Sequence, residues 1–457
     1  MAFALPLTGL FDATVKLKVY ERGVSGAGDR LIGFTPEHLK KGLRVPSQRL
    51  WYVKPMGGYK DAQWTALATN LAKRSVPGLD LANRWDGDDR ALESLGRLPA
   101  LRLLQLDHTR VTDAGLGKLG AFAHLEILSV SPKTSDAGLR ALAGAGLDRL
   151  RDLDLRGSHV TEAGLNHLAA FPHLAVLALN QAMTDTAAAV LSTLTSLRDL
   201  DISLTAVGDS GIDTLTALPI ESLYASPRLT DIGLAHLATW THLRRLDLSR
   251  TQISDAGLSA LSNLPHLEDL ALTDTAITDA GLSEISHIAS LKTLELSGTQ
   301  MTVGGFDFLA RLQRLETLSL SMSQLTSDQT AVLARLPHLK TLILDGVPVP
   351  ETLLASLRGG KKSTFAAAPP AVLTTIHQTP AVETAQRKPT PAAPAPLLAN
   401  AKRFPGSERK LSGLRNIQRI ETEASEISDV FTSSQRQTAD ENQPKRFLGD
   451  IDVRVKP

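Results

Sequence analysis

The sequence predicts an α/β solenoid, in which short strand–helix units repeat along the chain and stack on one another. Two observations predict it. A motif L-x-x-L-x-L recurs from Leu101 to Leu339 at steps of 23 to 25 residues, and most copies are followed by a segment close to T-D-A-G-L. A unit of one strand and one helix cannot bury its apolar side alone, so its stability must come from packing against neighbouring units.

The first half of each unit is predicted to be a short strand, because apolar and polar residues alternate there with a period of two. A weaker copy at Val76 precedes the first clear copy by 25 residues. Such regular spacing over eleven clear copies cannot arise by chance. The eleven copies begin at Leu101, Leu125, Leu150, Leu174, Leu197, Ile220, Leu243, Leu267, Leu291, Leu315 and Leu339.

The second half of each unit is predicted to be a helix, because its apolar residues lie three or four positions apart. The clearest copies begin at Thr112, Ser254 and Thr278. Thr and Ser are good helix N-caps, and the Asp that follows lies near the positive end of the helix dipole. Stacking buries the leucines of both halves, and each fully buried side chain contributes ~1.5–3 kcal/mol before conformational entropy is charged.

This pattern resembles the leucine-rich-repeat family from about Val76 to Leu357. The T-D-A-G-L half is similar to the variant of F-box substrate adaptors and of bacterial leucine-rich-repeat proteins, including effectors delivered into host cells. The resemblance implies a horseshoe with a parallel sheet on its concave side and helices on its convex side. It also implies binding more often than catalysis. The chain departs from the family where Thr or Ser replaces Cys or Asn after the strand, at Thr109, Ser158, Thr205, Thr251, Thr275 and Thr299.

Changes in composition divide the chain into four regions. The first should hold a hairpin, formed by Thr14–Tyr20 and Leu31–Phe34, and a cap in which Arg49–Val53 and Asp61–Leu71 imitate one repeat unit. The repeat array follows, and a Pro- and Ala-rich stretch then predicts a disordered linker. The four regions are residues 1–75 (hairpin and cap), 76–358 (solenoid), 359–410 (linker) and 411–457 (tail).

The tail is predicted to contain two elements. Ile417, Ile420, Ala424, Ile427 and Phe431 follow one another at steps of three and four residues, which predicts an amphipathic helix. The helix could dock in a partner groove or pack on the end of the solenoid. Asp450–Lys456 alternates apolar and charged residues and is expected to be a strand. That strand could add to a sheet edge of a partner or of the array itself.

Charge is unevenly divided along the chain, although the formal net charge is only +1. Residues 1–75 carry 12 basic and 5 acidic side chains, residues 76–358 carry 22 and 33, and residues 359–457 carry 15 and 10. An acidic array between two basic flanks argues against a nucleic-acid partner and permits the tail to fold back electrostatically. Ordinary solvation of charged surfaces explains the same distribution.

Composition also excludes several classes of protein. The absence of cysteine removes disulfides, thiolate zinc sites and cysteine nucleophiles. No segment approaches the ~18–20 apolar residues that span a bilayer. Ala2–Phe11 is a poor signal peptide, because no Lys or Arg precedes it and no clear cleavage site follows. We therefore expect a cytoplasmic monomer with no membrane partner, or export into a host by a non-classical route.

Charged side chains flank the second and third leucines of several units, where the repeat geometry directs them out of the concave sheet. Neighbouring strands lie ~4.8 Å apart, so these side chains form ladders. Arg and Tyr are residue types that anchor protein interfaces. For any one of them, pairing within the ladder is the alternative to binding a partner. The predicted partner-binding residues are Arg151, Asp152, Asp154, Arg156, Arg198, Asp199, Asp201, Tyr224, Arg244, Arg245, Asp247 and Asp269.

Catalytic and metal sites find little support in the sequence. Asp152 and Asp154 form a pair of carboxylates suited to acid–base chemistry or to a metal ion. Arg151 and Arg156 are expected to neutralise that pair, and no His lies at ligand spacing. Five histidines precede the first leucine of a unit and mark turns. We therefore predict no catalytic residue, no metal ligand and no cofactor.

The leading hypothesis is a non-enzymatic scaffold that binds a protein partner on the concave repeat face. One alternative is a bacterial effector in a host cell, acting as a substrate adaptor of a ubiquitin ligase. That alternative needs an F-box within residues 1–75, where Phe34–Leu43 bears a faint likeness to one. A second alternative is an enzyme whose active site lies in the N-terminal region or the tail.

Overall fold

The structure is a computed structural model that describes most of the first 345 residues and a short C-terminal segment. The described residues belong to one compact unit, made of residues 1–362 and 446–457. A second unit, residues 363–445, lies outside the described residues, as do the predicted linker and the predicted amphipathic helix. The described ranges are 17–23, 29–35, 49–56, 61–73, 75–82, 88–96, 98–321, 326–345 and 452–456.

Sixteen strands of the described ranges form one sheet, in the order β16-β15-β14 and so on to β4-β3-β1-β2. From β3 to β16 the neighbours are parallel, whereas β1 pairs antiparallel with both β2 and β3. The strands are β1 Leu17–Glu21, β2 Arg30–Thr35, β3 Trp51–Pro55, β4 Gly78–Asp80, β5 Leu103–Gln105, β6 Ile127–Ser129, β7 Asp152–Asp154, β8 Val176–Ala178, β9 Asp199–Asp201, β10 Ser222–Tyr224, β11 Arg245–Asp247, β12 Asp269–Ala271, β13 Thr293–Glu295, β14 Thr317–Leu320, β15 Thr341–Asp345 and β16 Asp452–Lys456.

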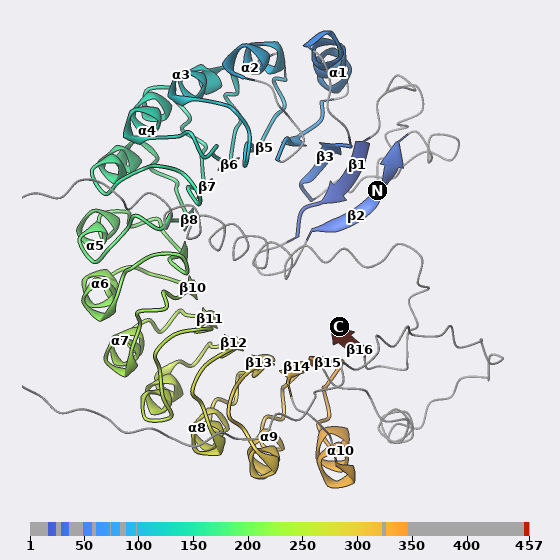
Figure 1. The fold of residues 1–457 in the computed structure, drawn as a ribbon, viewed down its shortest axis with the longest axis vertical. Coiled ribbons are helices and arrows are strands. Elements are labelled where there is room, and N and C mark those ends of the chain that lie inside the picture. The colour runs from blue at the N-terminus through green and yellow to red at the C-terminus, as the bar shows by residue number, and fades with distance from the viewer. Residues whose placement is uncertain are drawn as a thin grey trace, which may run out of the picture. The chain divides into compact units, whose positions relative to one another are not determined.

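Helices follow the strands and lie on the outer side of the arc that the strands line (Figure 1). This arrangement confirms the predicted horseshoe. Several units close with a 3₁₀ turn in place of an α-helix, because their helical halves are only one or two turns long. The α-helices are α1 Asp61–Lys73, α2 Asp89–Leu95, α3 Asp113–Leu116, α4 Asp136–Ala143, α5 Ala187–Leu191, α6 Asp209–Leu215, α7 Asp231–Leu237, α8 Asp279–Ile285, α9 Phe306–Leu309 and α10 Ser327–Ala334. The 3₁₀ segments are η1 Gly117–Ala121, η2 Gly164–Ala170, η3 Gly257–Asn263 and η4 Val303–Gly305.

The second leucine of each unit forms a continuous column through the core. In register, Leu104 pairs with Leu128 and Leu128 with Leu153, and the same alignment repeats from strand to strand. Every member of this column is 0 or 1% exposed. The L-x-x-L-x-L motif thus packs each unit on the next. The column is Leu79, Leu104, Leu128, Leu153, Leu177, Leu200, Leu223, Leu246, Leu270, Leu294, Leu318 and Leu342.

The Asp of the T-D-A-G segment links its own unit to the following one. Asp255 Oδ1 accepts a hydrogen bond from the backbone N–H of Thr278 at 2.9 Å, and its Oδ2 accepts one from the Thr278 hydroxyl at 2.6 Å. We predicted only the interaction of this Asp with its own helix dipole. The same double bridge joins Asp89 to Thr112, Asp113 to Ser135, Asp136 to Thr161, Asp209 to Thr230, Asp231 to Ser254 and Asp279 to Thr302.

The Gly of the next T-D-A-G segment along the chain leaves room for that carboxylate. A Cβ added at Gly281 would lie 2.3 Å from Asp255 Oδ1, well inside van der Waals contact. One unit departs from the pattern in a compensating way. Glu162 takes the place of the Asp and accepts from the Thr184 N–H at 2.9 Å, and Ala187 takes the place of the following Gly. The longer Glu side chain therefore occurs in the joint where Ala, which has a Cβ, replaces Gly.

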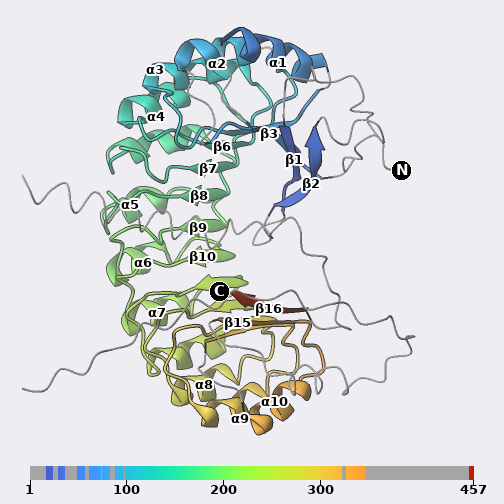
Figure 2. The same cartoon turned by 45° about the vertical axis from the view of Figure 1, so that its right-hand side comes forward.

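The N-terminal hairpin lies on the concave side of the first units (Figures 1 and 2). As expected, β1 pairs with β2, and β3 joins the hairpin to the parallel sheet. The rings of Tyr20 and Tyr52 stack with centroids 5.2 Å apart. Leu103, which stands in the register position of Asp152, is fully buried. The first rungs of the sheet are therefore covered, whereas later rungs expose polar side chains.

The last strand adds to the edge of the array itself. β16 pairs in parallel with β15, with Leu342 opposite Val453 and Leu344 opposite Val455. Val453 thus stands in the register of the leucine column. The sequence allowed this strand to pair with a sheet edge of a partner or of the array, and in the structure it pairs with the edge of the array. The limits of the four predicted regions stay predictions.

Candidate partner-binding surface

The candidate surface lies on the concave side of the sheet, on rungs β7 to β12 (Figure 2). Nine of the twelve predicted residues lie on these strands or, in the case of Arg156, two residues after one, and we call them the concave surface. The other three come just before a strand and belong to what we call the edge row. The concave surface is Asp152, Asp154, Arg156, Asp199, Asp201, Tyr224, Arg245, Asp247 and Asp269. The edge row is Arg102, Glu126, Arg151, Ala175, Arg198, Glu221, Arg244, Glu268, Lys292, Glu316 and Lys340.

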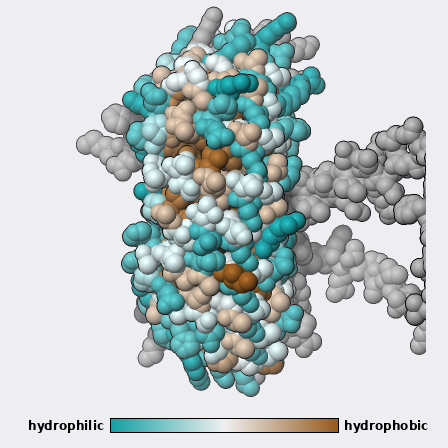
Figure 3. Space-filling view, turned by 90° about the vertical axis from the view of Figure 1, so that its left-hand side faces the viewer, coloured by the Kyte–Doolittle hydropathy of each residue, from teal (hydrophilic) through white to brown (hydrophobic). Residues whose placement is uncertain are grey.

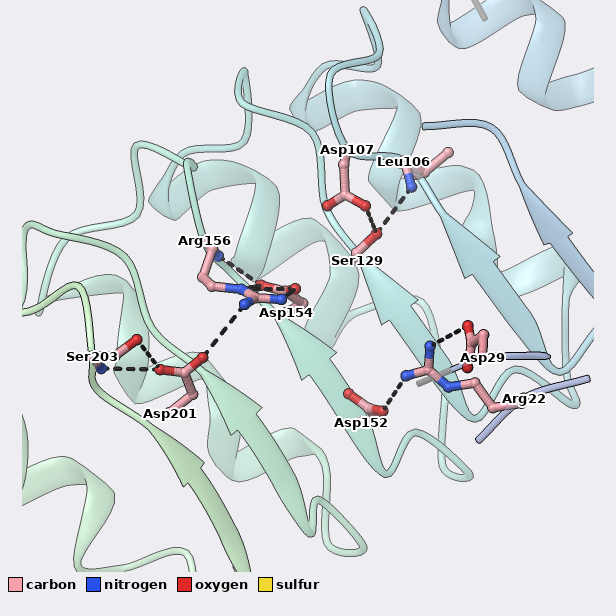
Figure 4. Close-up of polar contacts among 10 residues, drawn as sticks. All are labelled: Arg22, Asp29, Leu106, Asp107, Ser129, Asp152, Asp154, Arg156, Asp201 and Ser203. Atoms are coloured by element: carbon pink, nitrogen blue, oxygen red, sulfur yellow. Dashed lines mark hydrogen bonds and ion pairs between the residues drawn. The ribbon is translucent and has the colours of Figure 1, made fainter. Parts of the chain in front are cut away.

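Asp152 contacts the N-terminal hairpin and not its chain neighbour. Arg22 Nη2 lies 3.7 Å from Asp152 Oδ2, and Arg22 Nη1 lies 3.3 Å from Asp29 Oδ2 (Figure 4). The Tyr52 hydroxyl donates to Asp29 at 2.7 Å and holds that carboxylate in place. The expectation that Arg151 neutralises Asp152 is wrong, because Arg22 occupies that role. Burial raises the pKa of Asp152 to about 6, and the charge of Arg22 opposes that shift.

Arg156 joins two rungs of the sheet. Its Nη2 lies 2.5 Å from Asp154 Oδ2, and its Nη1 lies 3.4 Å from Asp201 Oδ2 (Figure 4). Asp201 also accepts from the backbone N–H and the hydroxyl of Ser203, at 2.9 and 2.6 Å. The charge of Asp154 raises the pKa of Arg156, and burial raises the pKa of Asp201. The expected neutralisation of Asp154 by Arg156 is therefore confirmed.

Asp107 belongs to this cluster and was missed by the sequence analysis. The Ser129 hydroxyl donates to Asp107 Oδ2 at 2.8 Å (Figure 4). Burial, reinforced by the charge of Asp154, raises the pKa of Asp107 to about 6. A signal was available, because Asp107 and Arg156 hold the same position in their units, directly after the third leucine. Arg22 carried no signal, because no periodic pattern relates the hairpin to rung β7.

A second cluster lies on β9 to β12. Arg245 Nη2 lies 3.5 Å from Asp199 Oδ2, and Arg245 Nε lies 3.4 Å from the Ser222 hydroxyl. Burial, followed by the charge of Asp199, raises the pKa of Tyr224. Asp247 accepts from the Ser249 N–H at 2.9 Å. Within the described chain, the Asp269 carboxylate makes no hydrogen bond or ion pair, so it faces the concave side with its acceptors available.

The three predicted arginines of the edge row differ in their partners. Arg244 Nη1 lies 3.5 Å from Glu268 Oε1, and Arg198 Nε lies 4.0 Å from Glu221 Oε1. Arg151 is exposed and has no ion pair among the residues that the structure describes. Arg244 thus forms an ion pair within the ladder, whereas Arg151 forms none among the described residues.

A metal site and a membrane-spanning helix are both absent from the residues that the structure describes. In the described ranges, no three His, Asp or Glu side chains come together in a group that could hold a metal ion. None of the helices drawn in Figure 1 is long and apolar enough to cross a membrane, over the part of the chain that the structure describes.

Comparison with known proteins supports the repeat. Family models described as leucine rich repeat match residues 241–301 and 193–215, and no curated protein matches the chain. Among solved structures, the chain is similar to an internalin from Listeria monocytogenes, with 22% identity and a TM-score of 0.41 over 66% of this chain and 89% of that one. It is also similar to the plant peptide hormone receptor RGFR1 in complex with RGF2, with 14% identity and a TM-score of 0.35 over 66% and 48%. The segments matched by the family models fall inside the series of strand–helix units from β4 to β15, so these segments carry leucine-rich repeats within one continuous sheet.

Proposed function

We propose that this protein is a non-enzymatic scaffold that binds a protein partner on its concave surface, and that the partner presents basic side chains there. The observation that carries the proposal is an excess of half-buried carboxylates over cations on the concave side from β5 to β12. Arg22, Arg156 and Arg245 face a larger set of carboxylates: Asp107, Asp152, Asp154, Asp199, Asp201, Asp247 and Asp269.

The raised pKa values of Asp107 and Asp152 support a basic partner. Both carboxylates hold their charge in a partly desolvated setting, which disfavours the ionised form. A Lys or Arg brought next to them gains charge-assisted hydrogen bonds and lowers those pKa values again. Tyr224 offers a rigid aromatic contact beside them, of the type that anchors interfaces. Opposite charges across the contact also speed the encounter at low salt.

The helix side of the molecule offers a weaker case. Figure 3 shows hydrophilic and hydrophobic residues interspersed there, with only small apolar areas. Ile232 and Val303 are the most exposed large apolar residues of the described ranges, at 67 and 58%, and they belong to different helical segments. Single exposed apolar residues are normal on a protein surface.

A site-specific photo-crosslinker tests the proposal. A benzophenone amino acid replaces Tyr224 on the concave surface in one variant, and Asp307, exposed on helix α9, in the other. We expect adducts with cellular protein from position 224, reduced when Asp269→Lys is added, because that change reverses a charge without removing a contact within the fold. Adducts from position 307 alone would contradict the proposal.

The alternative functions stay predictions. An F-box beginning at Phe34 would have to include the end of strand β2, and residues 36–43 lie outside the described ranges. Activity as a host-cell effector, an enzyme site in the flanks, a cytoplasmic or exported location and a monomeric state are likewise untested.

A further inference from the structure

The edge row alternates in charge along the sheet. Its members stand on successive rungs, because each backbone N–H donates to the carbonyl of the member before it, as Ala175 does to Arg151 and Arg198 does to Ala175, both at 2.8 Å. Read from Arg102 to Lys340, basic and acidic side chains take turns, with one exception. Ala175 stands where the alternation requires a carboxylate.

The ion pairs follow the alternation. Most basic members lie close to a Glu of the row, at 2.7 Å for Arg102–Glu126, 3.5 Å for Arg244–Glu268, 2.8 Å for Lys292–Glu268 and 2.5 Å for Lys340–Glu316. The two arginines beside Ala175 are the exceptions. Arg198 reaches its Glu only at 4.0 Å, and its Nη1 donates to the carbonyls of Thr195 and Leu197 at 3.0 and 2.8 Å. Arg151 has no ion pair among the described residues. The row therefore lacks one negative charge, at a single known rung.

The geometry around this rung suits one carboxylate. Arg151 and Arg198 stand two rungs apart, which is about 10 Å at the usual strand spacing. A carboxylate placed between these two rungs could accept from the free N–H groups of both guanidinium groups, and such charge-assisted bonds are stronger than neutral ones. Ala175 is half-buried and has no side chain beyond Cβ to fill the space.

We propose that the gap at Ala175 is a docking site for an Asp or Glu side chain of the protein partner, held between Arg151 and Arg198. The site lies beside the concave surface, next to Asp152 and Asp154 on rung β7. The partner segment thus carries one acidic residue at the edge of the sheet and basic residues over its centre. This inference rests on the proposed function, because it specifies the chemistry of the partner that the concave surface binds.

Substitution of Ala175 tests the site in two ways. Ala175→Glu supplies the missing carboxylate from the chain itself, and Ala175→Gln is its neutral isostere. We expect Ala175→Glu to have a higher melting temperature than Ala175→Gln, because only Glu pairs with both arginines. An equal or lower melting temperature would show that the gap does not accept a carboxylate and would overturn the inference without any partner.

Random peptides displayed on phage are then selected on the full-length protein, and the affinities of the selected peptides are compared among variants. We expect a shared acidic position in these peptides and about a tenfold loss of affinity with Ala175→Glu or Arg151→Gln, the loss of roughly one charge-assisted contact. Lys340→Gln, a change at a paired member of the same row, should leave the affinity unchanged within about twofold.

The outcomes separate the two proposals. Peptides that bind Ala175→Glu as tightly as the wild type, or that share no acidic position, would overturn the docking site and leave the concave scaffold standing. A selection that enriches no peptide at all would count against both.

Discussion

Single residues of the T-D-A-G segment link one unit to the next. The Asp carboxylate bridges to the Thr or Ser of the following unit, and the following Gly provides the space it occupies. The sequence predicts the N-cap role of the Thr, because a cap depends only on residues next to it in the chain. The sequence does not predict the bridge from Asp to the next Thr or Ser, because these partners lie about one repeat apart in the chain and meet only when the units stack.

Gly281→Ala should destabilise the protein by about 1–3 kcal/mol, because the new Cβ collides with Asp255 Oδ1 and with side chains of the core. Urea unfolding followed by circular dichroism measures the effect. Adding Asp255→Glu should recover part of the loss, since Glu162 and Ala187 already form this combination in another unit. A double variant whose loss is the sum of the two single losses would refute the coupling.

Asp107→Asn should make stability less sensitive to pH. The pKa of Asp107 is raised to about 6, above the ~3.9 of an unfolded chain, so the folded state binds more protons between about pH 4 and 6. Stability from this group therefore falls as pH rises through that window. Asn removes the titration and keeps an acceptor for Ser129. We expect a gain of about 1 kcal/mol near neutral pH, after solvent screening, and none near pH 4. Equal stability to the wild type at both pH values would contradict this expectation, and Asp307→Asn serves as the control.

Different elements cover the open backbone edge at the two ends of the repeat sheet. A solenoid exposes an open edge at each terminal rung, where unpaired backbone groups invite other strands. At the N-terminus, β3 joins the first repeat to the β1–β2 hairpin. At the C-terminus, β16 returns from a distant part of the chain to pair with β15. The alternation in Asp450–Lys456 identified a strand but could not choose its partner, because a period of two defines faces and not edges.

Removal of residues 452–457 should expose the edge of β15. We expect faster amide hydrogen exchange over Thr341–Asp345, because the bonds to β16 are lost, and no change over Asp199–Asp201 in the interior of the array. Mass spectrometry of the intact and shortened proteins measures both segments in one experiment. Unchanged protection of β15 would show that β16 does not cap the sheet.

Across the whole unit, charges far apart in sequence meet on one surface. The repeat fixed the rung and the face of every predicted residue, which is why nine of them share the concave surface. The spacing of the repeat could not predict contacts between repeat residues and residues that precede the repeat. Arg22 reaches Asp152 from the hairpin, 130 positions earlier in the chain, and Lys54 binds Asp80 at 2.7 Å. The sequence thus predicts which charged residues share the concave side, whereas the ion pairs within the fold depend on how the cap folds over the first rungs.

The series of carboxylate bridges also has an end. Val303 takes the place of the Asp in its unit, and Thr326 in the next unit exchanges two hydrogen bonds with Gln329 of its own helix, at 2.7 and 3.4 Å. At this joint, the helix start is therefore capped from within its own unit. We therefore expect the stack to separate more easily at this joint than between two units that a carboxylate bridge connects.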